Sequence, residues 1–267
     1  MRLTAELIGR FEQHIGEGVE SLLTRSLAVP GNLEGYALYR DGPIRASLST
    51  NPHARWATQT YGLTGCSADA VTRLVDFFEA HRVPACARIV PPGFTAEQAD
   101  ALSERGLRQT AFHATAWAPL PLPAVPAPDV DIREVATEAE MDTHIDFQLA
   151  AWDAPPPVID YLRPLRRTWL GLEGRRFYLA YVDGTPAAQA ILSWRDDIGY
   201  LEHAGTLPQF RRRGLQLALV RRRIADATAL GCRVIFGGAD FGSQSLANQI
   251  ACGLSVAYLA ARWTQRR

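Results

Sequence analysis

The residues of this sequence that are best suited to binding a ligand lie in a short arginine-rich turn. Arg211, Arg212 and Arg213 precede Gly214, and a long helical pattern follows. The first N–H groups of a helix have no partner inside it, and the helix dipole is positive there, so such a turn attracts phosphate. Glycine allows close backbone approach, and guanidinium groups neutralise phosphate charge. The pattern predicts a phosphate-binding turn; an ordinary solvated arginine face is the alternative.

A carboxylate lies just before this turn. Glu202 is four residues before Thr206, on a segment whose pattern predicts a strand over 198–206. A half-buried carboxylate in a cleft has a raised pKa and suits a general base, whereas a surface strand carboxylate is the alternative. Neighbours on a regular strand point to opposite faces, so we expect His203 on the face opposite Glu202, as a structural histidine.

The elements that must position these residues follow from the patterns around them. Thr137 and Glu140 form a capping-box pattern at the start of a predicted helix. Asp183-Gly184 is a hairpin turn signal between two apolar runs. We expect helices at 137–152, 209–230 and 244–252, and strands at 177–182, 187–194, 198–206, 233–239 and 254–263.

The two halves of the chain repeat one order of elements. Each contains a helical pattern, a strand with a cysteine (Cys86 or Cys232), a second helix, a Gly-Leu pair and a strand that ends at Trp117 or Trp263. The first half has no arginine-rich turn; Gly62 to Ser67 stands there instead. We therefore predict a duplicated fold whose first copy has lost its phosphate site, with weak anion binding by that loop as the alternative.

A proline-rich stretch separates the halves. Five of the ten residues from 119 to 128 are proline, which disfavours both helix and sheet interior. We predict a first domain at 1–118, a linker at 119–128 and a second domain at 129–267.

Composition excludes several classes of function. The 267 residues carry 28 basic and 28 acidic side chains, and every basic one is arginine, so no chemistry that needs a lysine is available. Zero net charge disfavours a general nucleic-acid or membrane-surface binder. The four cysteines lie far apart, which predicts reduced thiols in a cytoplasmic protein and no metal site. The sequence indicates neither a signal peptide nor a spanning helix.

The arginine-rich turn resembles the coenzyme A motif of the GNAT superfamily of N-acetyltransferases. Arg211, Gly214 and Gln216 occupy its motif positions, although Gln216 replaces a small residue. Residues 243–254 are similar to the second coenzyme A segment, with Leu254 where phenylalanine is usual. The resemblance implies an α/β fold of α+β type with a mixed sheet, as two tandem GNAT-like domains of which the first is degenerate.

The resemblance also implies the site. Acetyl-CoA would be the co-substrate, and donors for the oxyanion are expected around Thr206 and Leu207. Glu202 is the expected base. Gln249 stands where the superfamily has its acid tyrosine, so the acid is either Tyr258 or solvent. The residues expected to bind acetyl-CoA are Thr206, Leu207, Arg211, Arg212, Arg213, Gly214, Leu215, Gln216, Ser245 and Asn248.

The acceptor is expected between two helices of the second half. Trp152, Asp153 and Tyr161 could hold an amine by stacking, cation–π contact and charge pairing; a helix–helix turn with a buried tryptophan is the alternative. The predicted function is transfer of an acetyl group to a primary amine of a small molecule by direct attack, in a monomer with an intrachain pseudo-dimer or in a homodimer. A non-catalytic acyl-CoA binder and a basic-helix nucleic-acid binder, with seven arginines and one acid over 209–233, remain as alternatives.

Overall fold

The computed structural model describes residues 1–32, 34–123, 129–150 and 156–266. The chain forms two compact units: unit 1 comprises Met1–Ala114 with Ala257–Arg267, and unit 2 comprises Thr115–Val256. Strands β5 (Leu107–Pro119) and β11 (Ser255–Gln265) each pass from one unit to the other. Among the described residues, no helix is both long and apolar enough to span a membrane.

Unit 1 packs helices against small sheets. Strands β1, β2 and β3 form an antiparallel sheet, and β4 pairs antiparallel with the end of β11. Leu74, Val75 and Phe78 come from one face of α2 at helical spacing and are almost fully buried in its core. Its elements before β5 are α1 (Ala5–Leu27), β1 (Tyr36–Asp41), β2 (Ile44–Ser49), the 3₁₀ helix η1 (Pro52–Ala57), β3 (Gln59–Tyr61), α2 (Ala68–Ala80), β4 (Cys86–Ile89) and α3 (Ala96–Glu104).

Unit 2 is built on a mixed sheet in the order β5-β10-β9-β8-β7-β6. Strands β9 and β10 are parallel, and β6 to β9 pair antiparallel. Its elements between β5 and β11 are β6 (Asp131–Glu134), α4 (Glu138–Ala150), α5 (Pro156–Arg167), β7 (Arg175–Val182), β8 (Thr185–Arg195), β9 (Ile198–Thr206), the 3₁₀ helix η2 (Pro208–Phe210), α6 (Leu215–Ala229), β10 (Val234–Asp240) and α7 (Gln244–Ala251).

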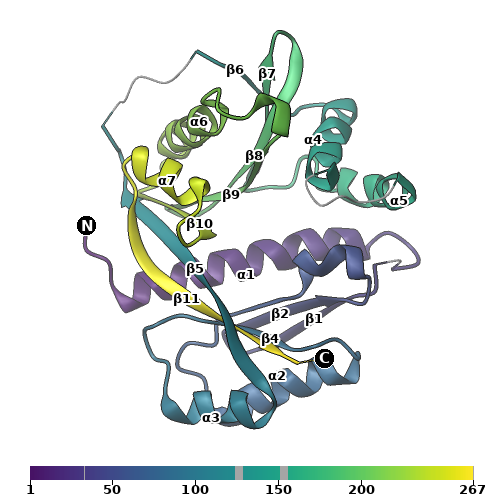
Figure 1. The fold of residues 1–267 in the computed structure, drawn as a ribbon, viewed down its shortest axis with the longest axis vertical. Helices are drawn as coiled ribbons and strands as arrows, with labels where there is room; N and C mark the ends of the chain where they lie inside the picture. Colours follow the sequence, from purple (N-terminus) through teal and green to yellow (C-terminus); the bar gives the residue numbers. More distant parts are fainter. Residues whose placement is uncertain (33, 124–128, 151–155, 267) are drawn as a thin grey trace. The chain divides into compact units, whose positions relative to one another are not determined.

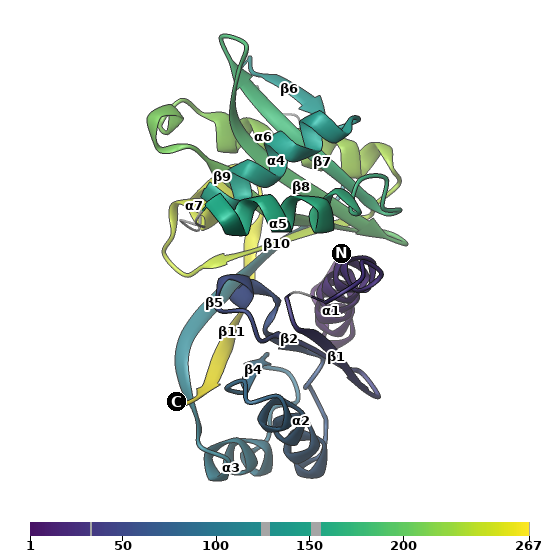
Figure 2. The same cartoon turned by 90° about the vertical axis from the view of Figure 1, so that its right-hand side faces the viewer.

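The helices of unit 2 cover both faces of its sheet. Helix α6 lies on one side of β7 to β9, and α4 and α5 lie on the other (Figures 1 and 2). Strand alternation gives the same division, because Tyr178 on β7 hydrogen-bonds to Asp226 of α6, whereas its neighbour Phe177 contacts His144 of α4. The site described below therefore has an α6 face and an α4–α5 face.

Local sequence signals account for many element boundaries. The amide of Glu140 donates to Thr137 Oγ1 at 3.3 Å, and the Thr137 amide donates to the Glu140 carboxylate at 3.1 Å, so the predicted capping box is confirmed. The Asp183-Gly184 turn has φ of 51° and 74°, which matches the turn that joins twisted strands. The repeated order of elements is also confirmed, as α2-β4-α3-β5 and α6-β10-α7-β11.

Helix α6 begins later than predicted. The sequence pattern suggested a helix from residue 209, but α6 starts at Leu215. Arg212 and Gly214 have φ of 63° and 75°, a left-handed conformation that a right-handed helix cannot contain. The apolar stripe does not extend through residues 211–214, so it gave no support for a helix before Leu215.

The compact units differ from the predicted domains at two places. The amide of Leu120 donates to Arg233 O at 2.8 Å, and Leu122 packs against Gly253, so the described start of the predicted linker belongs to unit 2. Residues 257–267, expected in the second domain, belong to unit 1, because β11 pairs with β4 from Ala261 opposite Ile89 to Thr264 opposite Cys86. Trp263 at this end packs on Phe94.

Candidate functional site

Strands β9 and β10 separate at the carboxyl end of their pairing. Their parallel register runs from Ile198 opposite Val234 to Leu201 opposite Gly237. Strand β9 then continues to Thr206 and β10 to Asp240 without further described pairing between them. This divergence leaves an open edge on β9 directly before the arginine-rich turn.

Strand β9 carries a bulge where it leaves β10. On β8, the single residue Ile191 lies between Ala190, opposite Ala204, and Leu192, opposite Leu201. Glu202 and His203 therefore share one opposing residue, which is the pattern of a β-bulge. The bulge breaks the regular alternation at the two residues whose chemistry the sequence singled out.

The hydrogen bonds between β8 and β9 beyond the bulge determine which peptide groups face the open edge. The Leu207 amide donates to Ala187 O at 3.1 Å, so this N–H group is occupied, contrary to the expected role of Leu207 as an oxyanion donor. Hydrogen-bonding alternates along an antiparallel pair, and therefore Ala204 and Thr206 direct their peptide groups away from β8. These two residues present the donors of the β9 edge.

The arginine-rich turn joins this edge to α6. Arg211 Nε donates to Thr206 O at 3.4 Å, and the three arginine side chains at 211–213 are exposed. Gly214 is the N-cap of α6, and no side chain caps the helix there. The first turn of α6 thus presents its N–H groups beside three guanidinium groups, an arrangement that favours a phosphate.

The second predicted phosphate segment is connected to this turn. Ser243 caps α7 by accepting from the Leu246 amide at 3.2 Å. Gln216 Nε2, at the start of α6, donates to Ser245 Oγ at 3.3 Å. The side chain of Asn248 accepts from Gln244 at 3.1 Å on the exposed side of α7. Gln216 and Ser245 are therefore brought together, as the sequence suggested.

Glu202 is held by a buried arginine. Arg175 Nη1 lies 2.5 Å from Glu202 Oε1, and their side chains are 3% and 16% exposed. Arg175 alternates with Phe177 on β7, which places the ion pair on the α4–α5 face. The sequence did not suggest Arg175 as a partner, because its strand neighbour Arg176 looks identical in the pattern.

His203 shares the face of Glu202, which corrects the expectation of opposite faces. Gln189 Nε2 contacts His203 Nδ1 at 2.8 Å, and Gln189 is opposite Leu179 on the same side of the sheet as Phe177. Burial and the charges of Arg166 and Arg223 lower the pKa of His203 to about 4. The bulge explains the difference, since it lets two successive side chains emerge on one side of the strand.

Polar side chains from α4 and α5 are buried over this face. His144 is fully buried, and burial, together with His203, lowers its pKa to about 3. Arg166 is also buried, donates to Gln148 Oε1 at 3.1 Å and lies over the Trp169 ring. The sequence signal that could have found these two residues is a histidine and an arginine at helix positions that face the core.

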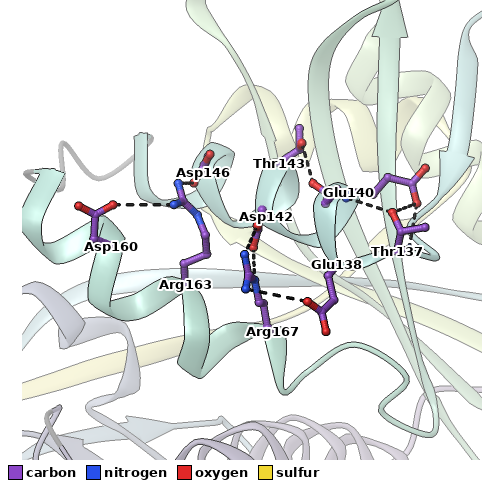
Figure 3. A network of polar contacts seen from close by, with 10 residues as sticks. Thr137, Glu138, Glu140, Asp142, Thr143, Asp146, Asp160, Arg163 and Arg167 are labelled. Carbon is purple, nitrogen blue, oxygen red and sulfur yellow. Dashed lines mark hydrogen bonds and ion pairs between the residues drawn. The ribbon is translucent and has the colours of Figure 1, made fainter.

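Ion pairs on the outer surface hold α4 and α5 together (Figure 3). Arg163 Nη2 lies 2.8 Å from Asp146, and Arg167 Nε lies 2.6 Å from Asp142. Both arginines come from α5 and both acids from α4, at a four-residue spacing that aligns them along the two helices. These pairs fix the helices whose inner faces carry His144 and Arg166.

The predicted acceptor residues are largely beyond what the structure describes. Trp152 and Asp153 lie outside the described residues. Tyr161 belongs to α5, but its side chain is not among those described. The assignment of these three residues to an amine acceptor stays a prediction.

Tyr258, the predicted acid, belongs to unit 1. Its hydroxyl donates to Glu12 Oε1 at 2.7 Å, and Arg88 Nε lies 3.0 Å from the other oxygen of Glu12. Glu12 and Tyr258 are 2% and 6% exposed. The structure thus gives Tyr258 a place in a buried polar network that joins α1, β4 and β11.

The loop of unit 1 that corresponds to the arginine-rich turn is closed on itself. The Gly65 amide donates to Gly93 O at 3.3 Å, and the Cys66 amide donates to Leu63 O at 3.2 Å. Ser67 caps α2 through its hydroxyl. Two amides of this loop and the Ser67 hydroxyl are therefore engaged within unit 1, whereas no side chain caps the start of α6.

A protein-family model matches part of the second half of the chain. Residues 127–243 match the model of the acetyltransferase (GNAT) domain. No curated protein matches the chain by sequence.

Solved structures resemble the chain over most of its length. A GCN5-related N-acetyltransferase from Kribbella flavida has a TM-score of 0.64 at 16% identity, with 94% of this chain and 95% of that chain covered. A tandem GNAT protein from the clavulanic acid biosynthesis pathway has a TM-score of 0.59 at 17% identity, with 91% and 86% covered. A GCN5-related N-acetyltransferase from Sphaerobacter thermophilus has a TM-score of 0.59 at 14% identity, with 83% and 80% covered. These likenesses confirm the predicted tandem fold.

Proposed function

We propose that this chain, which has the tandem GNAT fold and a GNAT acetyltransferase domain at 127–243, transfers an acetyl group from acetyl-CoA to a primary amine of a small molecule. The observation that carries the proposal is the divergence of β9 from β10 directly before an arginine-rich turn and an uncapped helix start. An open strand edge and an anion site, arranged in sequence, suit a ligand with an amide-bearing arm and a pyrophosphate.

Acetyl-CoA, the acetyl donor, would bind with its phosphates at the arginine-rich turn and its pantetheine arm along β9. The N–H groups of Gly214, Leu215 and Gln216 face the pyrophosphate, and the guanidinium groups at 211–213 neutralise its charge. The amides of the pantetheine arm pair with the β9 edge, where Ala204 and Thr206 point outward. We assign Ser245, which is linked to Gln216, and Asn248 to the same site.

In the reaction, the neutral amine attacks the thioester carbonyl, the carbon–sulfur bond breaks and the thiolate leaves. The Ala204 N–H, next to the bulge, is the donor that we assign to the oxyanion. Glu202 accepts the proton that the amine loses, directly or through water, while Arg175 holds its carboxylate. Solvent protonates the thiolate, because the hydroxyl of Tyr258 is engaged with Glu12.

The acceptor would lie against α4 and α5. The ion pairs of Figure 3 hold these helices, whose inner faces meet the side of the sheet that carries Glu202. Trp152, Asp153 and Tyr161 remain the residues that we assign to the amine. We further propose that the protein acts in the cytoplasm, as a monomer with two tandem copies or as a homodimer.

A panel of amines tests this function. Purified full-length protein is incubated with acetyl-CoA and each amine, and free thiol and product mass are measured. We expect thiol release that depends on one class of amine, with a product heavier by one acetyl group. Tight acetyl-CoA binding without thiol release for any amine would instead favour the non-catalytic acyl-CoA binder.

The nucleic-acid alternative has less support. Of the arginines counted over 209–233, Arg223 is buried and Arg222 pairs with Asp226 at 3.0 Å, so the basic face of α6 is smaller than the sequence suggests. A shift assay with generic DNA at two salt concentrations separates the alternatives, since phosphate binding weakens steeply with salt. We expect no shift at physiological salt.

A further inference from the structure

The bulge in β9 interrupts the backbone hydrogen bonds between two strands. Where Glu202 and His203 share Ile191 as their opposing residue, the regular exchange of hydrogen bonds between β8 and β9 is interrupted. The carbonyls of Ile191 and Glu202 lie at this interruption. A buried carbonyl without a partner costs free energy comparable to a lost hydrogen bond, so both groups need donors.

Arg223 supplies these donors from the other layer of unit 2. Its Nη1 lies 3.0 Å from Ile191 O and 2.9 Å from Glu202 O, and its Nε lies 3.0 Å from Leu219 O, one turn earlier in α6. The side chain is 1% exposed. One nitrogen atom thus bridges β8 and β9 at the bulge, and Nε is anchored to α6.

Burial of a cation at this position costs desolvation free energy, and packing of the core does not require a charged residue here. Arg223 stands on the buried face of α6 among Leu219, Val220 and Ala227, where an apolar residue would avoid desolvation of a charge. Burial lowers the pKa of the Arg223 guanidinium to about 10. The bulge gives the reason for the charge, because a fork of donors satisfies two carbonyls that no aliphatic side chain could.

We propose that Arg223 is a positioning residue, which fixes the bulge in β9 so that the Ala204 N–H points at the thioester oxygen of the bound donor. The inference rests on the proposed acetyl transfer. Helix α6 presents the phosphate turn at its start and Arg223 two turns further on. The same helix therefore holds both the phosphates and the β9 segment that meets the acyl group. The distance between these two points is set by the rigid geometry of α6.

The test measures the thioester carbonyl itself. Acetyl-CoA labelled with ¹³C at the thioester carbonyl is bound to the full-length chain, and its infrared stretching frequency is compared with that of the free molecule. In the unaltered protein, a hydrogen bond from the oxyanion donor should lower the frequency. In Arg223→Met the shift should be lost and turnover with the best amine should fall about 10²-fold, the typical cost of a misplaced oxyanion donor. The Kd for acetyl-CoA should change less than about threefold, since most binding comes from the phosphate turn.

Two further variants keep the outcome interpretable. Arg222→Met, on the neighbouring residue, removes an arginine that pairs with Asp226 and should leave the frequency and the turnover unchanged. Arg223→Lys keeps a buried donor and should retain part of the shift; it decides the question if Arg223→Met does not fold. A full shift and full turnover in Arg223→Lys and Arg223→Met would overturn the inference.

The wild-type measurement separates this inference from the proposed function. Acetyl-CoA that binds without a frequency shift would refute the role of the bulge while the donor site stands. A chain that binds no acetyl-CoA would refute the proposed function, and the positioning role with it.

Discussion

The carboxylate of Glu202 is bound by the guanidinium of Arg175 at 2.5 Å, on the same face of the sheet as His203. The residue that the sequence suggested as a base is thus half of a nearly buried ion pair. Removing one partner of such a pair leaves the other charge without compensation, whereas replacing both is far less costly. Catalysis and stability can therefore be separated by double substitution.

We expect Glu202→Gln to lower turnover about 10²-fold, a typical contribution of a general base, with acetyl-CoA binding unchanged. The same change should destabilise the fold by about 3 kcal/mol, because it removes the carboxylate that neutralises the buried Arg175 guanidinium. The double variant Glu202→Gln with Arg175→Met should regain stability in urea unfolding but not turnover. Turnover that returns together with stability would show that the carboxylate acts only in folding.

Gly214→Asp should weaken donor binding while the fold survives. A carboxylate at the start of α6 repels phosphate by about 1–4 kcal/mol, and a side chain blocks close backbone approach, so we expect at least a roughly tenfold weaker Kd by calorimetry. Gly231→Asp is the matched control, since Gly231 also has a positive φ, at the other end of the same helix, with open space around it. Equal affinities of the two variants would argue against a phosphate site at Gly214.

The full chain should bind one molecule of acetyl-CoA. The loop of unit 1 has committed its Gly65 and Cys66 amides to Gly93 and Leu63, while the start of α6 has no side-chain cap. Titration calorimetry should give a stoichiometry near one, and Gly214→Asp should remove that site. A second site that survives in Gly214→Asp would mean that the first copy also binds a donor.

Stability should fall as the pH falls below about 6.5. His144 and His203 have pKa values of about 3 and 4 in the folded protein and near 6.5 when unfolded, so the unfolded chain binds more protons between these values. Stability present above pH 6.5 is therefore lost progressively towards pH 4, at most about 1.4 kcal/mol per pH unit for each histidine. Urea unfolding at pH 7 and pH 5 measures the loss, and His144→Gln should reduce it. The same pH dependence in His144→Gln would place its origin elsewhere.

Local chemistry in the sequence was sufficient to predict several of the elements and their boundaries. Helix caps, hairpin turns and apolar periods depend on residues a few positions apart, so the capping box at Thr137 and the turn at Asp183 could be recognised directly. The repeated order of elements in the two halves followed from the sequence pattern in the same way.

Tertiary structure alone decided how the side chains of the candidate site are used. A bulge depends on the register between two strands, and this register put His203 beside Glu202 and made the carbonyls of Ile191 and Glu202 acceptors for Arg223. Pairing with β4 placed the end of β11, and with it Tyr258, in unit 1. In the sequence, Arg175 and Arg223 are two among 28 arginines; burial against particular partners, which no local pattern encodes, is what gives them a function.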